Sequence, residues 1–234
     1  MGIRDTIGKM PVVGNIARNV YRFLAGRIRK FPGSQEYWEQ RYAKGGHSGG
    51  GSSGRLARFK ADVINSFVKE NGIESVIEFG CGDGTQLSLA EYPEYTGFDV
   101  SPTAIRMCRE TFAPDASKIF FHFEPGNLSD NKDIRPADAA LSLDVIFHLI
   151  EDEVFNEYME ALFGSAKKYV IIYSSNFDDR QSYHVKNREF TRWIAENAPD
   201  WQMVRKIDNP HPYDSSDIEN TSRSDFYIFK KPGK

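Results

Sequence analysis

The stretch that decides the fold is Val76-Ile77-Glu78-Phe79-Gly80-Cys81-Gly82-Asp83-Gly84-Thr85. An apolar, β-branched run ends at Phe79, and glycine then stands at every second position. This pattern predicts a buried parallel strand over Ser75–Phe79, a tight turn, and a helix over residues 85–90. Glycine tolerates positive φ and lets a ligand approach the backbone, while the free N–H groups at a helix start attract an anion. The turn is therefore the first candidate ligand site.

The spacing of the glycines separates three kinds of nucleotide-binding loop. A phosphate-binding P-loop needs a lysine after the glycines, and none follows here. A dinucleotide-binding loop needs its third glycine where Thr85 stands, because Gly84 comes one residue early. The pattern that matches is an acid followed by alternating glycines, from Glu78 to Gly84. It resembles the first motif of the class I (Rossmann-like) S-adenosylmethionine (SAM)-dependent methyltransferases.

Two further segments stand where that family has its next motifs. Residues 95–100 read as the following strand, and Asp99 lies about twenty residues beyond the loop. Residues 138–149 resemble the fourth strand of the family and the positions just past it, which face the methyl group. The resemblance covers roughly residues 38–231 and implies SAM as cofactor, S-adenosylhomocysteine as product, and an enzyme that methylates an acceptor.

The composition fits a globular protein. The chain has 234 residues, of which 40% are hydrophobic and 13% aromatic. The net charge of -3 argues against a nucleic-acid binder, which would usually be basic. Two cysteines, Cys81 and Cys108, are too few for a disulfide framework and favour reduced thiols in a cytoplasmic protein. No apolar run predicts a transmembrane helix or a signal peptide.

Residues 1–34 are predicted as an N-terminal extension, and residues 35–234 as the methyltransferase domain. The first thirty residues carry seven basic side chains against one acid, Asp5, with apolar residues largely three or four apart. Such a segment can lie on an anionic membrane surface. It can equally pack its apolar side on the domain, because Pro11 and Gly14 interrupt the periodicity.

Strands and helices alternate along the rest of the chain. Ser101 and Pro102 are typical of a helix start, as N-cap and first helical residue. The remaining patterns predict helices over 35–42, 55–71, 151–163 and 184–198, and strands over 119–123, 169–173, 201–207 and 225–229. The fold class is therefore α/β: a doubly wound, mostly parallel seven-stranded sheet with helices on both faces and an antiparallel last strand, in a hairpin at the sheet edge.

The resemblance assigns the cofactor to named positions. It implies that Glu78 orients the loop and receives the cofactor ammonium, and that Asp99 accepts the ribose hydroxyls. Asn127 is expected either to bracket the adenine or merely to form a turn. Trp38 and Tyr42 either wall the site near the sulfonium, since aromatic faces attract cations, or pack in the core. The other predicted cofactor-binding residues are Gly80, Cys81, Gly82, Gly84, Val100 and Leu143.

The Gly/Ser-rich segment over residues 45–54 has two interpretations. Such composition is typical of a flexible linker. Related methyltransferases often close over SAM with a segment just before the first strand, and the resemblance therefore favours a loop that covers the cofactor.

The acceptor decides whether the reaction needs a base. An alcohol must lose its proton to a neighbour, whereas a neutral amine needs only deprotonation and alignment. His148 is the candidate base, because its position past the fourth strand faces the methyl group and its pKa suits proton transfer; a loop-holding role is the alternative. Asp144 either orients His148 or caps the next helix. Tyr173 and His184, the latter with Arg188, are candidates for the acceptor pocket, although surface roles are equally open for His184 and Arg188.

Several functions remain in competition. The five histidines show no zinc-binding spacing, and metal-independent chemistry is the prediction. We expect O-methylation of a small molecule or saccharide, which membrane contact would extend to a lipid-linked saccharide. The alternatives are N-methylation of a small amine, a catalytically silent SAM-binding module, and, more distantly, a nicotinamide dehydrogenase. Nucleic-acid methylation is disfavoured because residues 144–147 lack an N-P-P-Y-type tetrad. The oligomeric state is not predicted.

Overall fold

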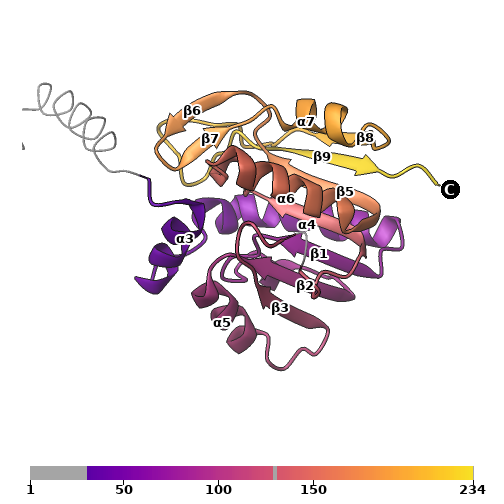
Figure 1. Ribbon diagram of the computed structural model, residues 1–234, viewed down its shortest axis with the longest axis horizontal. Coiled ribbons are helices and arrows are strands. Elements are labelled where there is room, and N and C mark those ends of the chain that lie inside the picture. Colours follow the sequence, from indigo (N-terminus) through magenta and orange to yellow (C-terminus); the bar gives the residue numbers. More distant parts are fainter. Residues whose placement is uncertain (1–30, 129–130, 234) are drawn as a thin grey trace, which may run out of the picture.

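The computed structural model describes residues 31–128 and 131–233 (Figure 1). Of the predicted N-terminal extension over residues 1–34, the basic segment 1–30 with its predicted membrane contact lies outside the described residues. Within the described ranges, no helix combines the length and apolar character needed to cross a bilayer.

Seven strands form one sheet in the order β3-β2-β1-β4-β5-β9-β8. Pairing is parallel from β3 through β5, and β9 runs antiparallel to both of its neighbours, β5 and β8. The prediction of a mostly parallel seven-stranded sheet with an antiparallel last strand is therefore confirmed. The last strand lies inside the sheet, however, and β8 forms the edge. The strands are β1 Ser75–Phe79, β2 Glu94–Asp99, β3 Lys118–His122, β4 Ala137–Leu143, β5 Ala166–Ser174, β8 Gln202–Ile207 and β9 Asp225–Lys230.

The strand order reverses between β1 and β4. From β1 the chain proceeds to β2 and β3 on one side, and from β4 to β5 on the other. At such a reversal the connections leave the carboxyl ends of the two strands in opposite directions and open a crevice between them, where ligands bind in open α/β sheets. The glycine turn after β1 stands at this point.

Helices cover both faces of the sheet (Figure 1). Side chains of successive strand residues alternate, so Val76 packs with α4 and α5 while Ile77 packs with α6 and α7. Because both faces are buried, the central strands are almost entirely apolar. The helices are α3 Ser34–Ala43, α4 Gly54–Glu70, α5 Pro102–Thr111, α6 Asp152–Gly164 and α7 Phe190–Asn197, with short 3₁₀ turns η1 Gly50–Ser52, η2 Leu87–Leu89 and η3 Ile146–His148.

The helix predicted over residues 85–90 is wrong. Only the single turn η2 forms there, and Ala90 is already extended, with ψ 142°. The side chain of Asn65 explains the stop, because it donates to the Leu89 carbonyl at 2.9 Å and accepts from the Glu91 N–H at 3.0 Å. These two bonds replace the helical partners of the backbone.

The helix predicted over residues 184–198 is wrong in its first third. A two-stranded hairpin, β6 Asp179–Ser182 and β7 Val185–Asn187, precedes α7. The extended backbone is fixed by long-range side-chain bonds. Asn187 accepts from the Ser175 hydroxyl at 2.7 Å, and the Arg188 guanidinium donates to the Leu149 carbonyl at 2.9 Å. The local hydrophobic periodicity of a sequence does not reveal such distant partners.

The predicted N-cap of α5 gives the first test. Ser101 is fully buried, and its hydroxyl accepts from the Ala104 N–H at 3.1 Å while it donates to Glu39 at 2.6 Å. Ser101→Ala should lower the free energy of unfolding by about 1–2 kcal/mol, because a helix N–H loses its partner. Urea denaturation measures the loss. The control is Thr103→Val, which removes a Glu39 contact without touching the cap, and an equal loss in both variants would contradict the capping role.

Candidate functional site

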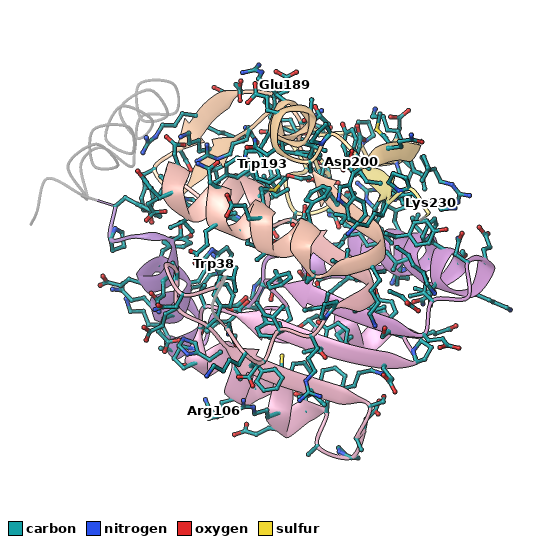
Figure 2. The ribbon with its side chains drawn as sticks, turned by 45° about the vertical axis from the view of Figure 1, so that its right-hand side comes forward. Trp38, Arg106, Glu189, Trp193, Asp200 and Lys230 are labelled. Atoms are coloured by element: carbon teal, nitrogen blue, oxygen red, sulfur yellow. The ribbon has the colours of Figure 1, made fainter. Side chains whose placement is uncertain are left out.

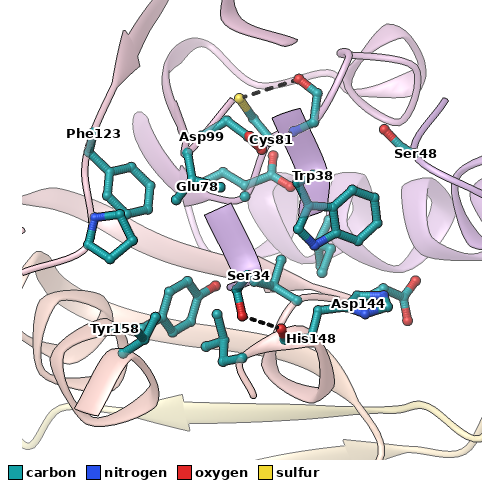
Figure 3. Close-up of a pocket in the computed structure, with 18 of the residues that line it drawn as sticks. Ser34, Trp38, Ser48, Glu78, Cys81, Asp99, Phe123, Asp144, His148 and Tyr158 are labelled. Carbon is teal, nitrogen blue, oxygen red and sulfur yellow. Dashed lines mark hydrogen bonds between the residues drawn. The ribbon is translucent and has the colours of Figure 1, made fainter. Parts of the chain in front are cut away.

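A cavity opens at the carboxyl ends of β1, β2 and β4, directly above the glycine turn. Figure 3 shows its two ends: Phe123 and Tyr158 lie at one, Trp38, Asp144 and His148 at the other. Trp38 lies near the middle of the molecule in Figure 2, whereas Arg106 and Lys230 lie at its periphery. The predicted site residues that line the cavity are Trp38, Tyr42, Glu78, Gly80, Cys81, Gly82, Asp99, Val100, Leu143, Asp144 and His148. Gly84, Asn127, Tyr173 and His184 are not part of the lining.

All three glycines of the turn stand where a side chain would lack room. Gly80 has φ 84°, and a Cβ there would lie 2.4 Å from Val145 Cγ2. Gly82 has φ 58°, and a Cβ would lie 2.4 Å from the Ser48 hydroxyl oxygen. Gly84 also has positive φ, but its Cβ would meet Phe112 of the α5 region. Gly84 thus serves packing beneath the loop, and its contact with the cofactor stays a prediction.

The N–H groups of the turn are not free for an anion. Those of Gly80 and Cys81 donate to the Phe98 carbonyl at 2.7 and 3.0 Å, and that of Gly82 donates to Asp99 at 2.9 Å. The N–H groups of the next three residues, 83 to 85, donate in turn to the Ser48 hydroxyl, the Cys81 carbonyl and the Asp83 carboxylate. Because no α-helix follows the turn either, the predicted helix-start anion site is wrong.

Asp99 presents a buried carboxylate at the end of β2. Its Oδ2 accepts from the Gly82 N–H and its Oδ1 from the Ser101 N–H, both at 2.9 Å. A carboxylate oxygen has two lone pairs, so each still has capacity for a hydroxyl donor. Burial raises the pKa of Asp99 to about 6, although these two bonds act in the opposite direction.

Glu78 is a second buried carboxylate, one strand away from Asp99. The Tyr95 hydroxyl donates to its Oε2 at 2.6 Å. Burial raises the pKa of Glu78 to about 7, and the Tyr95 bond and the charge of Lys60 only partly offset this effect. Both acids therefore carry a desolvation cost that a cationic or hydroxyl-bearing ligand would relieve.

The opposite end of the cavity is an apolar slot. It is lined by Val100, Phe123, Pro125, Leu128 and Tyr158. The loop that carries two of these residues is held by Glu157, whose carboxylate accepts from the Gly126 and Leu128 N–H groups, both at 2.6 Å. Such a slot suits a flat ring. Asn127 lies on the exposed side of this loop, where its N–H closes a turn on the Glu124 carbonyl, so the structure favours the turn role for it.

The Gly/Ser-rich segment packs against the glycine turn. Ser48 donates to Asp83 twice, from its N–H at 3.1 Å and from its hydroxyl at 2.8 Å. The Tyr42 hydroxyl lies 3.0 Å from the Ser48 hydroxyl oxygen. Just after the segment, Arg55 of α4 donates to the Asn220 carbonyl at 2.7 Å. Ser48 and Ser52 both line the cavity. The segment is thus a packed cover over one end of the cavity, which contradicts the linker interpretation.

His148 carries a neutral imidazole at the polar end. Its Nδ1 lies 3.1 Å from the His184 carbonyl oxygen, and since a carbonyl only accepts, Nδ1 holds the proton and Nε2 keeps a lone pair. Among the described residues no hydrogen bond to Nε2 is found. Desolvation lowers the pKa of His148 to about 4, and the bond to His184 acts against this shift. The ring is therefore a weaker base than the ordinary imidazole on which the prediction from sequence relied. The Trp38 ring packs edge-on against the imidazole, with centroids 4.8 Å apart.

Asp144 does not orient His148 by a hydrogen bond. Its carboxylate accepts from Lys60 Nζ at 2.8 Å and from the Ser224 hydroxyl at 2.9 Å. It is also the one described residue other than glycine with positive φ, 58°, a backbone conformation that residues with side chains rarely adopt. The group that orients the His148 ring is instead the His184 carbonyl, through its hydrogen bond with Nδ1.

The two predicted acceptor residues lie behind the cavity wall. Tyr173 is fully buried, and its ring packs on Phe226 and Phe59 with centroids 4.7 and 6.2 Å away. The His184 ring stacks on Tyr37 at 4.9 Å and on His148 at 6.0 Å. Arg188 is buried among the carbonyls that precede α6. His184 therefore reaches the site through its carbonyl.

Sequence reasoning missed several polar residues of the cavity lining, among them Lys60 and Gln86. Lys60 is 1% exposed. It lies four residues after Leu56 and four before Ile64, which both belong to the apolar stripe of α4. A single cation on an otherwise apolar stripe is unusual, and this could have marked Lys60 as a site residue. Gln86 had no comparable signal, because its position was predicted to be an ordinary helical one. Among the described residues, no group of three metal-ligating side chains is found.

Solved structures with similar folds come from several bacteria. The N-methyltransferase NodS from Bradyrhizobium japonicum, in complex with S-adenosylhomocysteine, has a TM-score of 0.63 at 12% identity and covers 86% of this chain and 99% of its own. Magnesium protoporphyrin IX methyltransferase ChlM from Synechocystis, with the same product bound, has a TM-score of 0.58 at 15% identity, covering 85% and 98%. A SAM-dependent methyltransferase from Clostridium acetobutylicum has a TM-score of 0.56 at 12% identity, covering 94% and 99%.

The chain has the class I methyltransferase fold. Identities below 20% support the fold and leave the acceptor open, since NodS and ChlM carry different acceptor chemistry in their names. Searches against protein-family models and against curated proteins gave no match.

The lack of room at Gly82 gives a stability prediction. Gly72 has nearly the same φ, 56°, but nothing lies within 4 Å of its Cβ position, so it is a matched control. Gly72→Ala should cost about 1–2 kcal/mol for the left-handed backbone alone. Gly82→Ala should cost at least about 1 kcal/mol more, because overpacking adds to that strain. Urea denaturation compares them, and equal losses would show that the turn tolerates a side chain.

The buried Glu78 gives a pH prediction. The unfolded chain ionises this group above its ordinary pKa of 4.5, but the folded protein does so only above about 7. Stability is therefore lost as pH rises through this window, by up to about 3 kcal/mol. Glu78→Gln should be close to wild type in unfolding free energy near pH 4.5 and more stable above pH 7. A pH-independent difference between the two proteins would refute the shifted pKa.

Proposed function

We propose that the protein transfers a methyl group from SAM to a hydroxyl of a small molecule or saccharide. The observation that favours a hydroxyl over an amine as acceptor is the protonation state of the His148 ring. Its protonated Nδ1 is bound to the His184 carbonyl, its Nε2 keeps a lone pair, and the residue lines the polar end of the cavity. A hydroxyl needs such a proton acceptor, whereas a neutral amine does not depend on one.

The residues that line the cavity fit SAM along its length. The apolar slot around Phe123 and Leu128 would take the adenine, and the remaining lone pairs of Asp99 would take the ribose hydroxyls. Gly80 and Gly82 would lie along the methionine part, with the Leu143 region beside it. Trp38 and Tyr42 would wall the sulfonium, where aromatic faces favour a cation. The Ser48 segment would cover the site and exclude water.

Bound SAM supplies an already activated methyl group. The protein then has to align the acceptor, exclude water and hold one proton. In this proposal His148 Nε2 takes the hydroxyl proton as the acceptor oxygen attacks. The resulting imidazolium would be stabilised by the His184 carbonyl and by the Asp144 charge, which acts favourably on the protonated ring. The half-buried rings of Tyr37 and Tyr183 adjoin the histidine pair and would flank the acceptor.

Two measurements test this function. Calorimetry should detect binding of SAM and S-adenosylhomocysteine but not of NAD, and methyl transfer should be found with sugars or phenols in an acceptor panel. Turnover on amines alone would replace the proposal by N-methylation. Cofactor affinity without turnover on any acceptor would leave a silent binding module.

We also propose a cytoplasmic location, peripheral to the membrane if residues 1–30 bind lipid. Both cysteines are free thiols in buried positions, as expected for a reducing compartment. Cell fractionation of the full chain and of a chain lacking residues 1–30 tests the two parts of this proposal separately.

The proposed base gives a kinetic prediction. His148→Ala should lower kcat by about 10²–10⁴-fold while the affinity for S-adenosylhomocysteine changes little, because the ring serves proton transfer. His211→Ala, in the β8–β9 connection, is the control. Since the pKa of His148 is about 4, protonation of this ring should not reduce wild-type kcat at saturating SAM between roughly pH 8 and pH 6. Full activity in His148→Ala would eliminate the base.

A further inference from the structure

We propose that Lys60 and Gln86 recognise the amino-acid tail of the cofactor, Lys60 its carboxylate and Gln86 its ammonium. The inference rests on the proposed function, because it names the residues that would distinguish SAM from a nucleoside without this tail. Neither residue belongs to the glycine turn, and both line the same cavity as that turn.

The first step is that the turn cannot bind the carboxylate by its backbone. The N–H groups of residues 80–85 are all donated within the protein, to the Phe98 carbonyl, Asp99, the Ser48 hydroxyl, the Cys81 carbonyl and Asp83. The following η2 has only three residues and offers no helix start. A buried carboxylate without donors would be costly, so it needs a partner outside this turn, and a side chain of the cavity lining can supply one.

Lys60 is the one suitable cation. Among the described residues that line the cavity it is the only lysine or arginine, while four carboxylates, Glu78, Asp99, Asp144 and Glu157, line the same space. It is 1% exposed, and its Nζ bonds to Asp144 Oδ2 at 2.8 Å. An ammonium has three donors, so this single bond leaves two. Its charge also favours the ionised form of Glu78, which lines the same cavity.

Gln86 supplies the complementary acceptor. Its Nε2 donates to the Ala57 carbonyl at 3.1 Å, which fixes the orientation of the amide. Its Oε1 is buried and has no hydrogen-bond partner among the described residues. An unsatisfied amide oxygen in a cavity costs free energy that an incoming N–H donor recovers. Gln86 thus joins Glu78 as an acceptor for a ligand ammonium at this end.

The test pairs protein variants with three ligands: S-adenosylhomocysteine, its decarboxylated form, and 5′-methylthioadenosine, which lacks the whole tail. Lys60→Met should weaken S-adenosylhomocysteine by about tenfold or more and leave the other two within about twofold, because a charge-assisted hydrogen bond is lost. Gln86→Met should weaken the two ligands with an ammonium by about threefold or more and spare methylthioadenosine. Calorimetry measures each affinity.

The controls separate recognition from folding. Lys168→Met removes a lysine that is also paired with an aspartate, Asp138, at a position outside the cavity lining, and it should leave all three affinities unchanged. Lys60→Met with Asp144→Asn avoids an unpaired buried carboxylate and should reproduce the selectivity of the single variant. Equal weakening of all three ligands by either Lys60 variant, or unchanged affinity for S-adenosylhomocysteine, would overturn the inference. Failure of wild type to bind any of the three would overturn the proposed function itself.

Discussion

The site depends on one shared acceptor, the carbonyl of Phe98. It receives the N–H groups of both Gly80 and Cys81, and so it ties the end of β1 to the end of β2. The next N–H, from Gly82, goes to the carboxylate of Asp99. Three consecutive donors of the turn are thus fixed by two consecutive residues of the neighbouring strand. This geometry needs left-handed backbone at residues 80 and 82, and the alternating glycines follow from it.

In this arrangement the buried acids of the cavity carry a desolvation cost. Burial raises the pKa of Glu78 to about 7 and of Asp99 to about 6. Backbone donors that would stabilise these carboxylates are few, because the turn uses most of its N–H groups internally. The cavity is therefore electronegative and poorly compensated, with Lys60 as its internal counter-charge. A ligand with cationic groups and hydroxyls would supply the positive charge and the hydrogen-bond donors that these carboxylates lack. SAM carries both kinds of group, so its chemistry fits this cavity.

Local pattern was enough to predict the sheet, the glycine turn and the acid at residue 99. These features rest on short-range constraints: apolar runs buried on both faces, positive φ, and a carboxylate at a strand end. Prediction failed where a distant side chain decides the backbone. Asn65 stops the helix after the turn, and the Arg188 contacts extend residues that carry a helical pattern. Tyr173 lies outside the cavity lining, because a strand-end position does not reveal which face its side chain occupies. His184 was expected at a helix start and lies instead in the turn of the hairpin before α7.

Helix α6 connects the two ends of the cavity, and no sequence motif marks this role. At its start, Glu151 accepts from the Ser34 hydroxyl at 2.6 Å, and the same hydroxyl lies 2.9 Å from the His148 carbonyl oxygen. This contact fixes the beginning of α3, and with it Trp38, beside the imidazole. One and a half turns later, Glu157 holds the loop of the apolar slot, and the Tyr158 hydroxyl bonds to the Ser142 hydroxyl at 2.7 Å. Because one rigid helix positions both ends, the distance between the apolar slot and His148 is set by its length, and a displacement of α6 would disturb the two ends together.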